Sequence, residues 1–263
     1  MFGVVPKSIW QRLNPPDENN LCSWALRCLL IEDGDRLILI DNGMGNKQDA
    51  KFFGHYHLHG SETLDGSLEK HGFHRDDVTD VLLTHLHFDH CGGSIERSSQ
   101  GMLVPAFRNA VYWSNPRHWK WATEPNEREK ASFLKENILP IEQSGQLRMV
   151  EVASETTFTG NISIRFVNGH TDAMMIPHIN YNGKVVVFMA DLLPSVGHIP
   201  IPYVMAYDMF PLTTLQEKKD FLQNALDNQY ILFFEHDPAY ECCSLQLTEK
   251  GIRGGPGFLL SDI

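Results

Sequence analysis

One stretch of thirteen residues constrains this chain more than any other. Residues 81–93 read VLLTHLHFDHCGG, and the apolar run at the start is typical of a buried strand. In extended backbone, side chains two positions apart point to one side, so His85 and His87 can bind one metal ion. Asp89 and His90 follow where the chain must turn, and they can reach a second ion. Because imidazole and carboxylate groups suit zinc and similar divalent ions, the stretch predicts a metal site.

The composition limits the class of protein. A chain of 263 residues is long enough for one large domain or two small ones, and its 42% hydrophobic and 21% charged residues are ordinary for a soluble globular protein. The formal charge of −11 argues against a nucleic-acid partner. No segment has the character of a signal peptide or of a membrane span. Five cysteines, an odd number, favour free thiols, so we expect a cytoplasmic protein that binds neither nucleic acid nor membrane; a homodimer is left open.

Two hairpins are predicted far apart in the chain. Each has two apolar strands, a turn with an Asp-Gly or Asn-Gly pair, and an aspartate after the second strand. The strands are expected at Ser23–Ile31, Leu37–Ile40, His178–Tyr181 and Val185–Met189. The two aspartates are Asp41 and Asp191. This similarity indicates either a faint internal duplication or shared hairpin chemistry.

More ligand-type side chains follow predicted strands. His170 comes after the alternating segment Ile162–Val167, and His236 follows the apolar segment Tyr230–Phe234 by two residues. Strands of one sheet that end on one side would gather such groups in a single cleft. Between them, a helix is expected at Thr214–Asn228, with Thr214 and Glu217 as a capping box.

The H-x-H-x-D-H pattern of residues 85–90 resembles the motif of the metallo-β-lactamase-fold hydrolases, and the resemblance runs from about Leu21 to Pro238. It implies a mixed α/β (α+β) fold, an αββα four-layer sandwich of two mixed β-sheets with helices outside, in a single domain of residues 1–263. It also implies two divalent metal ions, with Zn²⁺ first and Mn²⁺, Fe²⁺ or Co²⁺ as alternatives. The implied ligands are His85, His87 and His170 for one ion, Asp89, His90 and His236 for the other, and Asp191 as a bridge.

The resemblance further implies a hydrolase in which a metal-bridging hydroxide attacks a small-molecule substrate, an ester, a lactone or a phosphotriester. Asp89 and Asp191 would be the catalytic carboxylates. The ligand order and the spacing from Asp191 to His236 are most similar to the lactonase and methyl parathion hydrolase branch. A glyoxalase II-like thioester hydrolase and a non-catalytic metal-binding or sensing protein are the alternatives. The segment Leu192–Ser195 lacks the tyrosine that quorum-signal lactonases often place there.

Further residues are expected around the metal site. Asp41 should accept a hydrogen bond from the free N–H of a ligand histidine. Candidate members of the substrate pocket are His198, Tyr207 and Trp113. The glycine pair Gly92–Gly93 is expected to let the backbone turn tightly.

Two segments are open to more than one interpretation. Residues 101–150 are expected to form an aromatic-rich insertion, either packed on itself or capping the metal site, with a helix at Glu127–Ile138. The run of three alternating histidines, His55, His57 and His59, would lie on one side of a strand and could bind metal. Because the run contains no carboxylate or cysteine, we favour a polar surface or lid segment.

Overall fold

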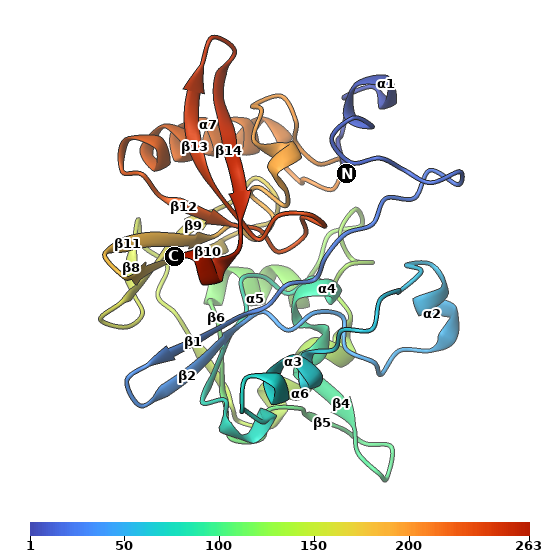
Figure 1. Ribbon diagram of the computed structural model, residues 1–263. Coiled ribbons are helices and arrows are strands. Elements are labelled where there is room, and N and C mark those ends of the chain that lie inside the picture. The colour runs from blue at the N-terminus through green and yellow to red at the C-terminus, as the bar shows by residue number, and fades with distance from the viewer. The chain divides into compact units, whose positions relative to one another are not determined.

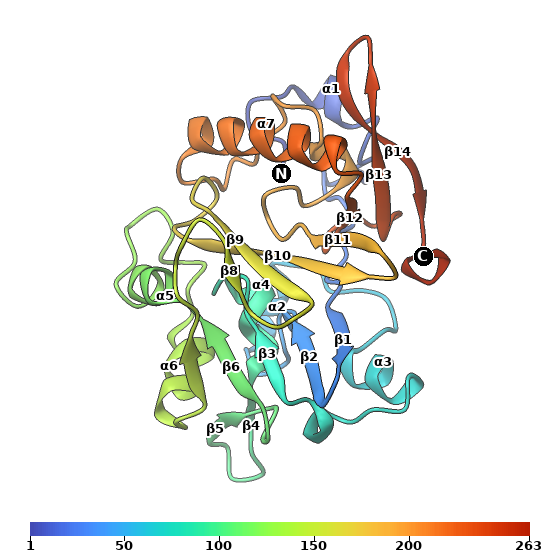
Figure 2. The same ribbon diagram turned by 90° about the vertical axis from the view of Figure 1, so that its left-hand side faces the viewer.

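The computed structural model describes residues 1–263 and contains two compact units. One unit comprises residues 28–150; the other, called here the discontinuous unit, comprises residues 1–27 and 151–263. Each unit has its own mixed β-sheet with helices (Figures 1 and 2). The predicted mixed α/β class is therefore confirmed, while the expectation of a single domain stays a prediction.

The 28–150 unit is built on a five-stranded sheet with the order β1-β2-β3-β6-β7. Its strands are β1 (Leu29–Asp33), β2 (Arg36–Ile40), β3 (Asp80–Leu82), β6 (Val111–Ser114) and β7 (Leu147–Met149), with a separate pair β4 (Ile95–Arg97) and β5 (Leu103–Pro105). Its helices are α2 (Ala50–Gly54), α3 (Leu64–Lys70), η1 (Arg75–Asp77), α4 (Phe88–Cys91), η2 (Gly92–Ser94), α5 (Pro116–Thr123) and α6 (Lys135–Gln143). The hairpin β1–β2 is antiparallel, and β2, β3, β6 and β7 are parallel.

The central strand β3 brings the metal-binding motif to one edge of this sheet. All of its residues are buried between β2 and β6, and this burial agrees with the apolar run that begins at Val81. Parallel strands end at the same edge, so Asp41 after β2 lies beside the segment after β3, and the Asp41 amide donates to the Leu82 carbonyl. The motif then enters the short helix α4 at Phe88.

The glycine pair after the motif is needed for close approach rather than for a turn. A Cβ added at Gly92 would lie 2.3 Å from the carbonyl oxygen of Met44, and one at Gly93 would lie 2.2 Å from that of Asn42. Gly92 itself has an ordinary right-handed helical φ of −61°. The backbone after β2 therefore packs directly on these residues, which leaves no room for a side chain.

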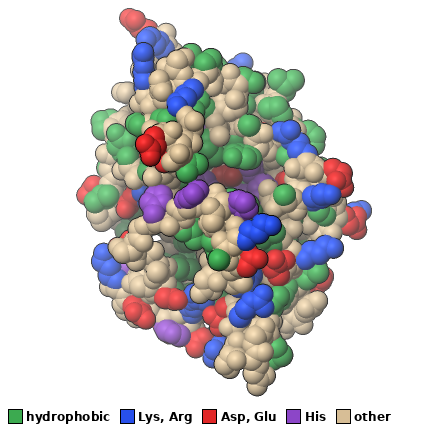
Figure 3. Space-filling view, turned by 90° about the vertical axis from the view of Figure 1, so that its right-hand side faces the viewer, with side chains coloured by type: hydrophobic (Ala, Val, Ile, Leu, Met, Phe, Trp, Pro, Cys, Tyr) green, Lys and Arg blue, Asp and Glu red, His purple; other side chains and the backbone are tan.

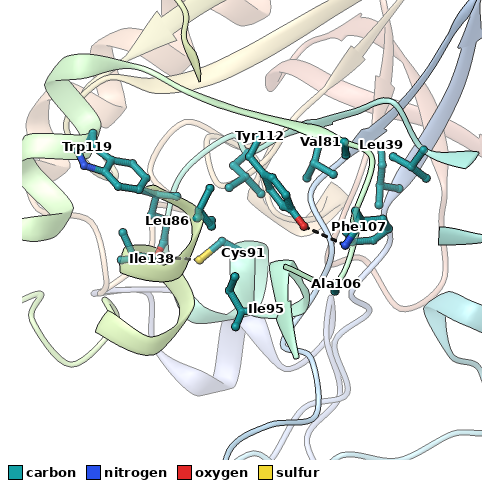
Figure 4. Close-up of a cluster of buried hydrophobic side chains, with 14 of the residues drawn as sticks. Leu39, Val81, Leu86, Cys91, Ile95, Ala106, Phe107, Tyr112, Trp119 and Ile138 are labelled. Atoms are coloured by element: carbon teal, nitrogen blue, oxygen red, sulfur yellow. Dashed lines mark hydrogen bonds between the residues drawn. The ribbon is translucent and has the colours of Figure 1, made fainter. Parts of the chain in front are cut away.

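The residues expected to form an insertion are part of the core of this unit. β6 and β7 belong to the same sheet as β1–β3, and Phe107, Tyr112 and Trp119 are buried in its main apolar cluster (Figure 4). The Tyr112 hydroxyl donates to the Ser94 carbonyl and accepts from the Phe107 amide, so the ring can be buried without an unsatisfied polar group. The insertion prediction is wrong because the aromatic residues serve the sheet.

The predicted helix at Glu127–Ile138 is also wrong in its bounds. Residues 127–130 form turns, and helix α6 begins only at Lys135 and continues through Pro140. A proline removes one backbone hydrogen bond, but buried Ile138 and Ile141 anchor the helix on both sides of it. The histidine run at residues 55–59 is no strand; it follows α2 and is exposed, as expected of a polar surface segment.

The discontinuous unit has a seven-stranded sheet with the order β14-β13-β12-β11-β10-β9-β8. Its strands are β8 (Thr156–Thr157), β9 (Ile162–Val167), β10 (Met174–Tyr181), β11 (Lys184–Phe188), β12 (Ile231–Phe233), β13 (Cys242–Thr248) and β14 (Gly251–Phe258). Its helices are α1 (Lys7–Trp10), η3 (Val196–His198), α7 (Pro211–Asp227) and η4 (Leu260–Asp262). The strands predicted before His170, Asp191 and His236 are all present.

Three strands of this sheet run in the same direction. β9 and β11 are both antiparallel to β10, and β12 is parallel to β11. Their carboxyl ends therefore meet at one edge of the sheet, and His170, Asp191 and His236 follow those ends. As in the other unit, an antiparallel hairpin is followed by a helical crossover to a parallel strand, here through α7 (Figure 2).

Helix α7 holds the loop that carries His170. The helix begins at Pro211, and the predicted capping box is wrong because the Glu217 carboxylate accepts from the backbone amides of Asn168 and Gly169 instead. A Cβ added at Gly169 would lie 2.3 Å from Oγ1 of Thr214, so the loop and the helix are in direct contact. This packing fixes the backbone from which His170 projects.

None of the helices has the length and apolar character that crossing a membrane requires. On the face shown in Figure 3, lysine and arginine side chains are interspersed with aspartate and glutamate.

Candidate functional site

The 28–150 unit carries four of the predicted ligands in one short segment, which follows β3 and enters α4. His85, His87 and His90 are buried, and Asp89 is partly exposed. The His85 Nε2 and His87 Nδ1 atoms are 3.0 Å apart, and the His90 Nε2 atom is 3.9 Å from an Asp89 carboxylate oxygen. The question is which of these ring nitrogens carries a hydrogen, because only a nitrogen with a lone pair can bind a metal ion.

The hydrogen-bond network answers this for His85. The buried Asp41 carboxylate can only accept, so the Thr84 hydroxyl donates to it at 2.6 Å. That hydroxyl has no second hydrogen, and it must therefore accept from Nδ1 of His85, which lies 3.1 Å away. Nε2 of His85 is then left with a lone pair.

The same reasoning gives the opposite tautomer for His87. Its Nε2 atom lies 2.9 Å from Oε1 of the buried residue Glu129, and a carboxylate can only accept. Nε2 therefore carries the hydrogen and Nδ1 carries the lone pair.

The two lone pairs of His85 and His87 face each other at 3.0 Å. Two acceptors at this distance repel unless a proton or a cation lies between them. Ligand atoms on a tetrahedral zinc ion, at about 2.0–2.1 Å from the metal, are about 3.3 Å from one another. The pair therefore fits two ligands of one ion.

His90 is oriented by Asp41 as well. Its Nδ1 atom donates to Oδ2 of Asp41 at 3.0 Å, while Oδ1 of Asp41 accepts from the Thr84 amide at 2.8 Å. The lone pair of His90 is consequently on Nε2, the atom that faces Asp89. Asp41 therefore controls the orientation of two histidines, one directly and one through Thr84.

The discontinuous unit brings its three predicted ligands together. The two oxygens of the Asp191 carboxylate face different imidazoles: Oδ2 lies 3.1 Å from Nε2 of His170, and Oδ1 lies 3.1 Å from Nε2 of His236. All three side chains are at least nine-tenths buried. A carboxylate with one imidazole nitrogen at each oxygen is the arrangement expected of a ligand that bridges two ions.

Here too the second ring nitrogens are already engaged. Nδ1 of His170 donates to the buried Asp208 at 3.0 Å, and Nδ1 of His236 donates to the Ala25 carbonyl at 2.9 Å. Each Nε2 atom then faces an acceptor oxygen of Asp191, and this contact is favourable only with a proton or a metal ion between the two atoms. Burial lowers the pKa of His170, but Asp191 and Asp208 outweigh burial and raise this pKa to about 10, so the site attracts a proton or a metal ion.

Both donor sets therefore fit a divalent metal. Five histidines have one ring nitrogen held by a hydrogen-bond acceptor and the other directed at a further ligand-type group. This is the usual environment of metal-ligating histidine, in which the outer partner fixes the tautomer and the ring orientation. The five are His85, His87, His90, His170 and His236.

The three candidate pocket residues differ in burial and in contacts. His198 is buried and stacks on Phe2 with ring centroids 4.4 Å apart, and burial lowers its pKa to about 3. The indole of Trp113 donates to Asp80, the first residue of β3, whereas the metal ligands follow the other end of that strand. Tyr207 is 59% exposed. The place of these three residues in a substrate pocket stays a prediction.

The sequence did not point to three partners of the ligand histidines, namely Glu129, Asp208 and the Ala25 carbonyl. Glu129 lies in a polar turn and Asp208 in a loop, and neither follows a strand. The neighbours of Glu129 and Asp208 are largely exposed, so no local signal marks the two carboxylates.

A family model described as the metallo-beta-lactamase superfamily matches residues 27–236 of the chain. The chain belongs to the metallo-β-lactamase superfamily. Among solved structures, a probable metal-dependent hydrolase from Staphylococcus aureus is 26% identical, with a TM-score of 0.88 over 98% of this chain and 90% of that one. No match was found among curated proteins.

Two further solved structures, one of them of a quorum-quenching lactonase, show the same fold. AidC, a dizinc lactonase, is 23% identical, with a TM-score of 0.74 over 90% of this chain and 81% of that one. AiiA from B. thuringiensis, as a mutant with N-decanoyl-L-homoserine bound, is 21% identical, with a TM-score of 0.63 over 82% of each chain. Superfamily membership and the 26% identical metal-dependent hydrolase indicate that the protein is a hydrolase, and its His/Asp cluster is of the kind that binds metal, as predicted.

Proposed function

We propose that this superfamily member is a dinuclear metal-dependent hydrolase of small esters, lactones or phosphotriesters, with zinc as the first candidate metal. The observation that carries the proposal is the Asp191 carboxylate, whose two oxygens each face Nε2 of a different histidine. One carboxylate between two such nitrogens is explained by one cation at each oxygen.

The proposed ligand sets are those that the resemblance to the superfamily implies. His85, His87 and His170 would hold the first ion, His90, His236 and Asp89 the second, and Asp191 would contact both. When bound, two such ions lower the pKa of water to about 7 and polarise the substrate oxygen under attack.

The exposure of Asp89 suggests its role in the reaction. Its side chain is 28% exposed, whereas the side chains of the other six proposed ligands are below 10%. Asp89 can therefore exchange a proton with solvent at the carboxylate oxygen that does not face His90. We infer that this oxygen passes a proton to the leaving group.

An aromatic cluster next to the motif favours a substrate with an apolar part. Phe88, between His87 and Asp89, packs against Phe52 and Tyr56 with ring centroids 5.4 and 4.8 Å apart. These rings offer an apolar wall beside the proposed ligands. Acyl chains and aryl leaving groups both fit such a wall.

The test is a substrate panel on zinc-reconstituted protein: an aryl ester, an aliphatic lactone, an aryl phosphotriester and a glutathione thioester. We expect turnover of at least one of the first three, its loss in Asp191→Asn, and normal turnover in the matched control Asp35→Asn, which alters an exposed turn. Turnover of the thioester alone would favour a glyoxalase II-like enzyme. Metal binding without any turnover would favour a binding or sensing protein.

A further inference from the structure

Glu129 connects the segment between α5 and α6 to one metal ligand. It is 2% exposed, and both oxygens of its carboxylate accept hydrogen bonds. Oε1 accepts from Nε2 of His87 at 2.9 Å, while Oε2 accepts from the indole Nε1 of Trp121 at 2.6 Å and from Nδ2 of Asn126 at 3.3 Å. Each oxygen therefore has a defined partner.

The backbone around Glu129 is held as firmly as the side chain. The Asn126 side-chain oxygen accepts from the amides of Arg128 and Glu129, which closes the turn. The Glu129 carbonyl accepts from the Ser132 amide, and the Ser132 carbonyl accepts from the Phe88 amide, next to His87 in the motif. The turn thus contacts the motif twice, through a side chain and through the backbone.

His87 is the exception among the five histidines. The other four have Nδ1 engaged and Nε2 left for a metal, whereas His87 has Nε2 engaged and Nδ1 left. The bond to Glu129 requires this choice, because a carboxylate can accept a hydrogen bond but cannot donate one.

We propose that Glu129 is a positioning residue that holds His87 as the Nε2–H tautomer and thereby sets the affinity of the first metal ion. The inference rests on the proposed metal-dependent function, which it deepens. Trp121 has a supporting role, because its indole N–H fixes which carboxylate oxygen remains for His87.

The variant Glu129→Gln tests this sharply because its amide has a forced orientation. The Gln oxygen must take the place of Oε2, where two donors point, and the NH₂ group then faces His87. An N–H donor opposite Nε2 requires a lone pair there, so the hydrogen moves to Nδ1. The variant should therefore select the tautomer that cannot bind metal through Nδ1.

The first readout needs no metal and no activity. Two-bond ¹H–¹⁵N spectra of metal-free protein with ¹⁵N-labelled histidine report which ring nitrogen carries the hydrogen. The spectra are recorded at about pH 8.5, above the ordinary histidine pKa of about 6.5, so that the rings are neutral. We expect His87 as Nε2–H in the natural chain and as Nδ1–H in Glu129→Gln. The second readout is zinc affinity by chelator competition, which should fall about 10–100-fold for the first ion.

The matched control is Glu127→Gln, the same chemical change two residues away on a side chain that is 88% exposed and paired with Lys130. It should leave the tautomer and the zinc affinity unchanged. A melting curve for each variant identifies the folded fraction on which both readouts are made.

A double variant separates positioning from general destabilisation. Trp121→Phe removes the strongest donor at Oε2, so in the pair with Glu129→Gln the amide can turn its oxygen toward His87. We expect a partial return of the Nε2–H tautomer and of zinc affinity relative to Glu129→Gln alone. A merely structural role would give two losses that add.

The outcomes distinguish the inference from the function on which it rests. If the natural chain binds zinc, but Glu129→Gln keeps the tautomer and the affinity, the inference is wrong and the proposed function stands. If the natural chain binds no zinc at all, both are wrong.

Discussion

The change Asp41→Asn should weaken metal binding through two histidines at once. Asp41 is fully buried and accepts from the Thr84 amide at 2.8 Å, from the Thr84 hydroxyl at 2.6 Å and from Nδ1 of His90 at 3.0 Å. Its φ is +53°, a left-handed conformation that asparagine tolerates well, so the backbone should not resist the change.

The orientation of the introduced side-chain amide decides the effect. The Thr84 backbone amide can only donate, so the oxygen of the new side chain must take the Oδ1 position, and its NH₂ group then replaces Oδ2. There it meets Nδ1–H of His90, which must lose its hydrogen to accept. The Thr84 hydroxyl also becomes an acceptor for the NH₂ group and is free to donate to Nδ1 of His85. Both histidines then carry hydrogen on Nε2, the nitrogen proposed to bind metal.

The expected loss is at the upper end of the usual 10–100-fold effect of such partners, or about 2–3 kcal/mol of zinc binding free energy. Chelator competition measures it, with Asp35→Asn as a control for the same change on an exposed turn. Thr84→Val keeps the side-chain shape, removes the hydroxyl that links Asp41 to His85 and leaves the bond from His90 to Asp41, so it should cost less than Asp41→Asn. Unchanged zinc affinity and unchanged activity in Asp41→Asn would refute the reasoning.

Three further predictions test the account elsewhere. His90→Ala should retain about one metal ion per chain by elemental analysis, and a full complement would remove His90 from the site. Burial lowers the pKa of His178 to about 4 in the folded protein. Between pH 4 and the ordinary histidine pKa of about 6.5, the unfolded chain therefore binds a proton that the folded one does not. The free energy of unfolding should be highest above pH 6.5 and should fall by about 3 kcal/mol toward pH 4. In His178→Phe, chemical denaturation across this range should give a shallower decline, and an unchanged decline would contradict the assignment. Trp119→Ala should cost about 3–5 kcal/mol of stability, since Trp119 is 8% exposed in the core, while kcat/KM of the folded fraction stays normal; reduced kcat/KM at normal stability would show substrate contact instead.

The features that could be predicted from the sequence are those that depend on residues close together in the chain, such as hairpins and the metal-binding motif. The hairpin β1–β2 and the hairpin β10–β11 have Gly at their turns and apolar strands on both sides, so pattern and turn chemistry agree. The motif after β3 was recognised because its histidines are local in sequence and follow a buried strand. Strand direction then explains why His170, Asp191 and His236 meet.

Contacts between distant segments could not be predicted in this way. Glu217 has the spacing of a capping box, yet its carboxylate bonds to residues 168 and 169, because the loop before His170 competes for it. Glu129 and Asp208 carry no periodic or motif signal, since their role depends on which histidine nitrogen they meet after folding. The aromatic residues of the segment 101–150 led to the wrong prediction of an insertion for the same reason. The sequence does not show whether an apolar side chain will face the core or a substrate.

The most direct test of the central claim is the number of metal ions per chain. The protein should be stripped with a chelator, reconstituted with excess zinc, freed of unbound metal and analysed for zinc against protein concentration. The account predicts close to two ions in the natural chain and fewer in Asp191→Asn, because Asp191 is proposed to contact both ions. One ion or none in the natural chain, or two in Asp191→Asn, would contradict a dinuclear centre bridged by Asp191.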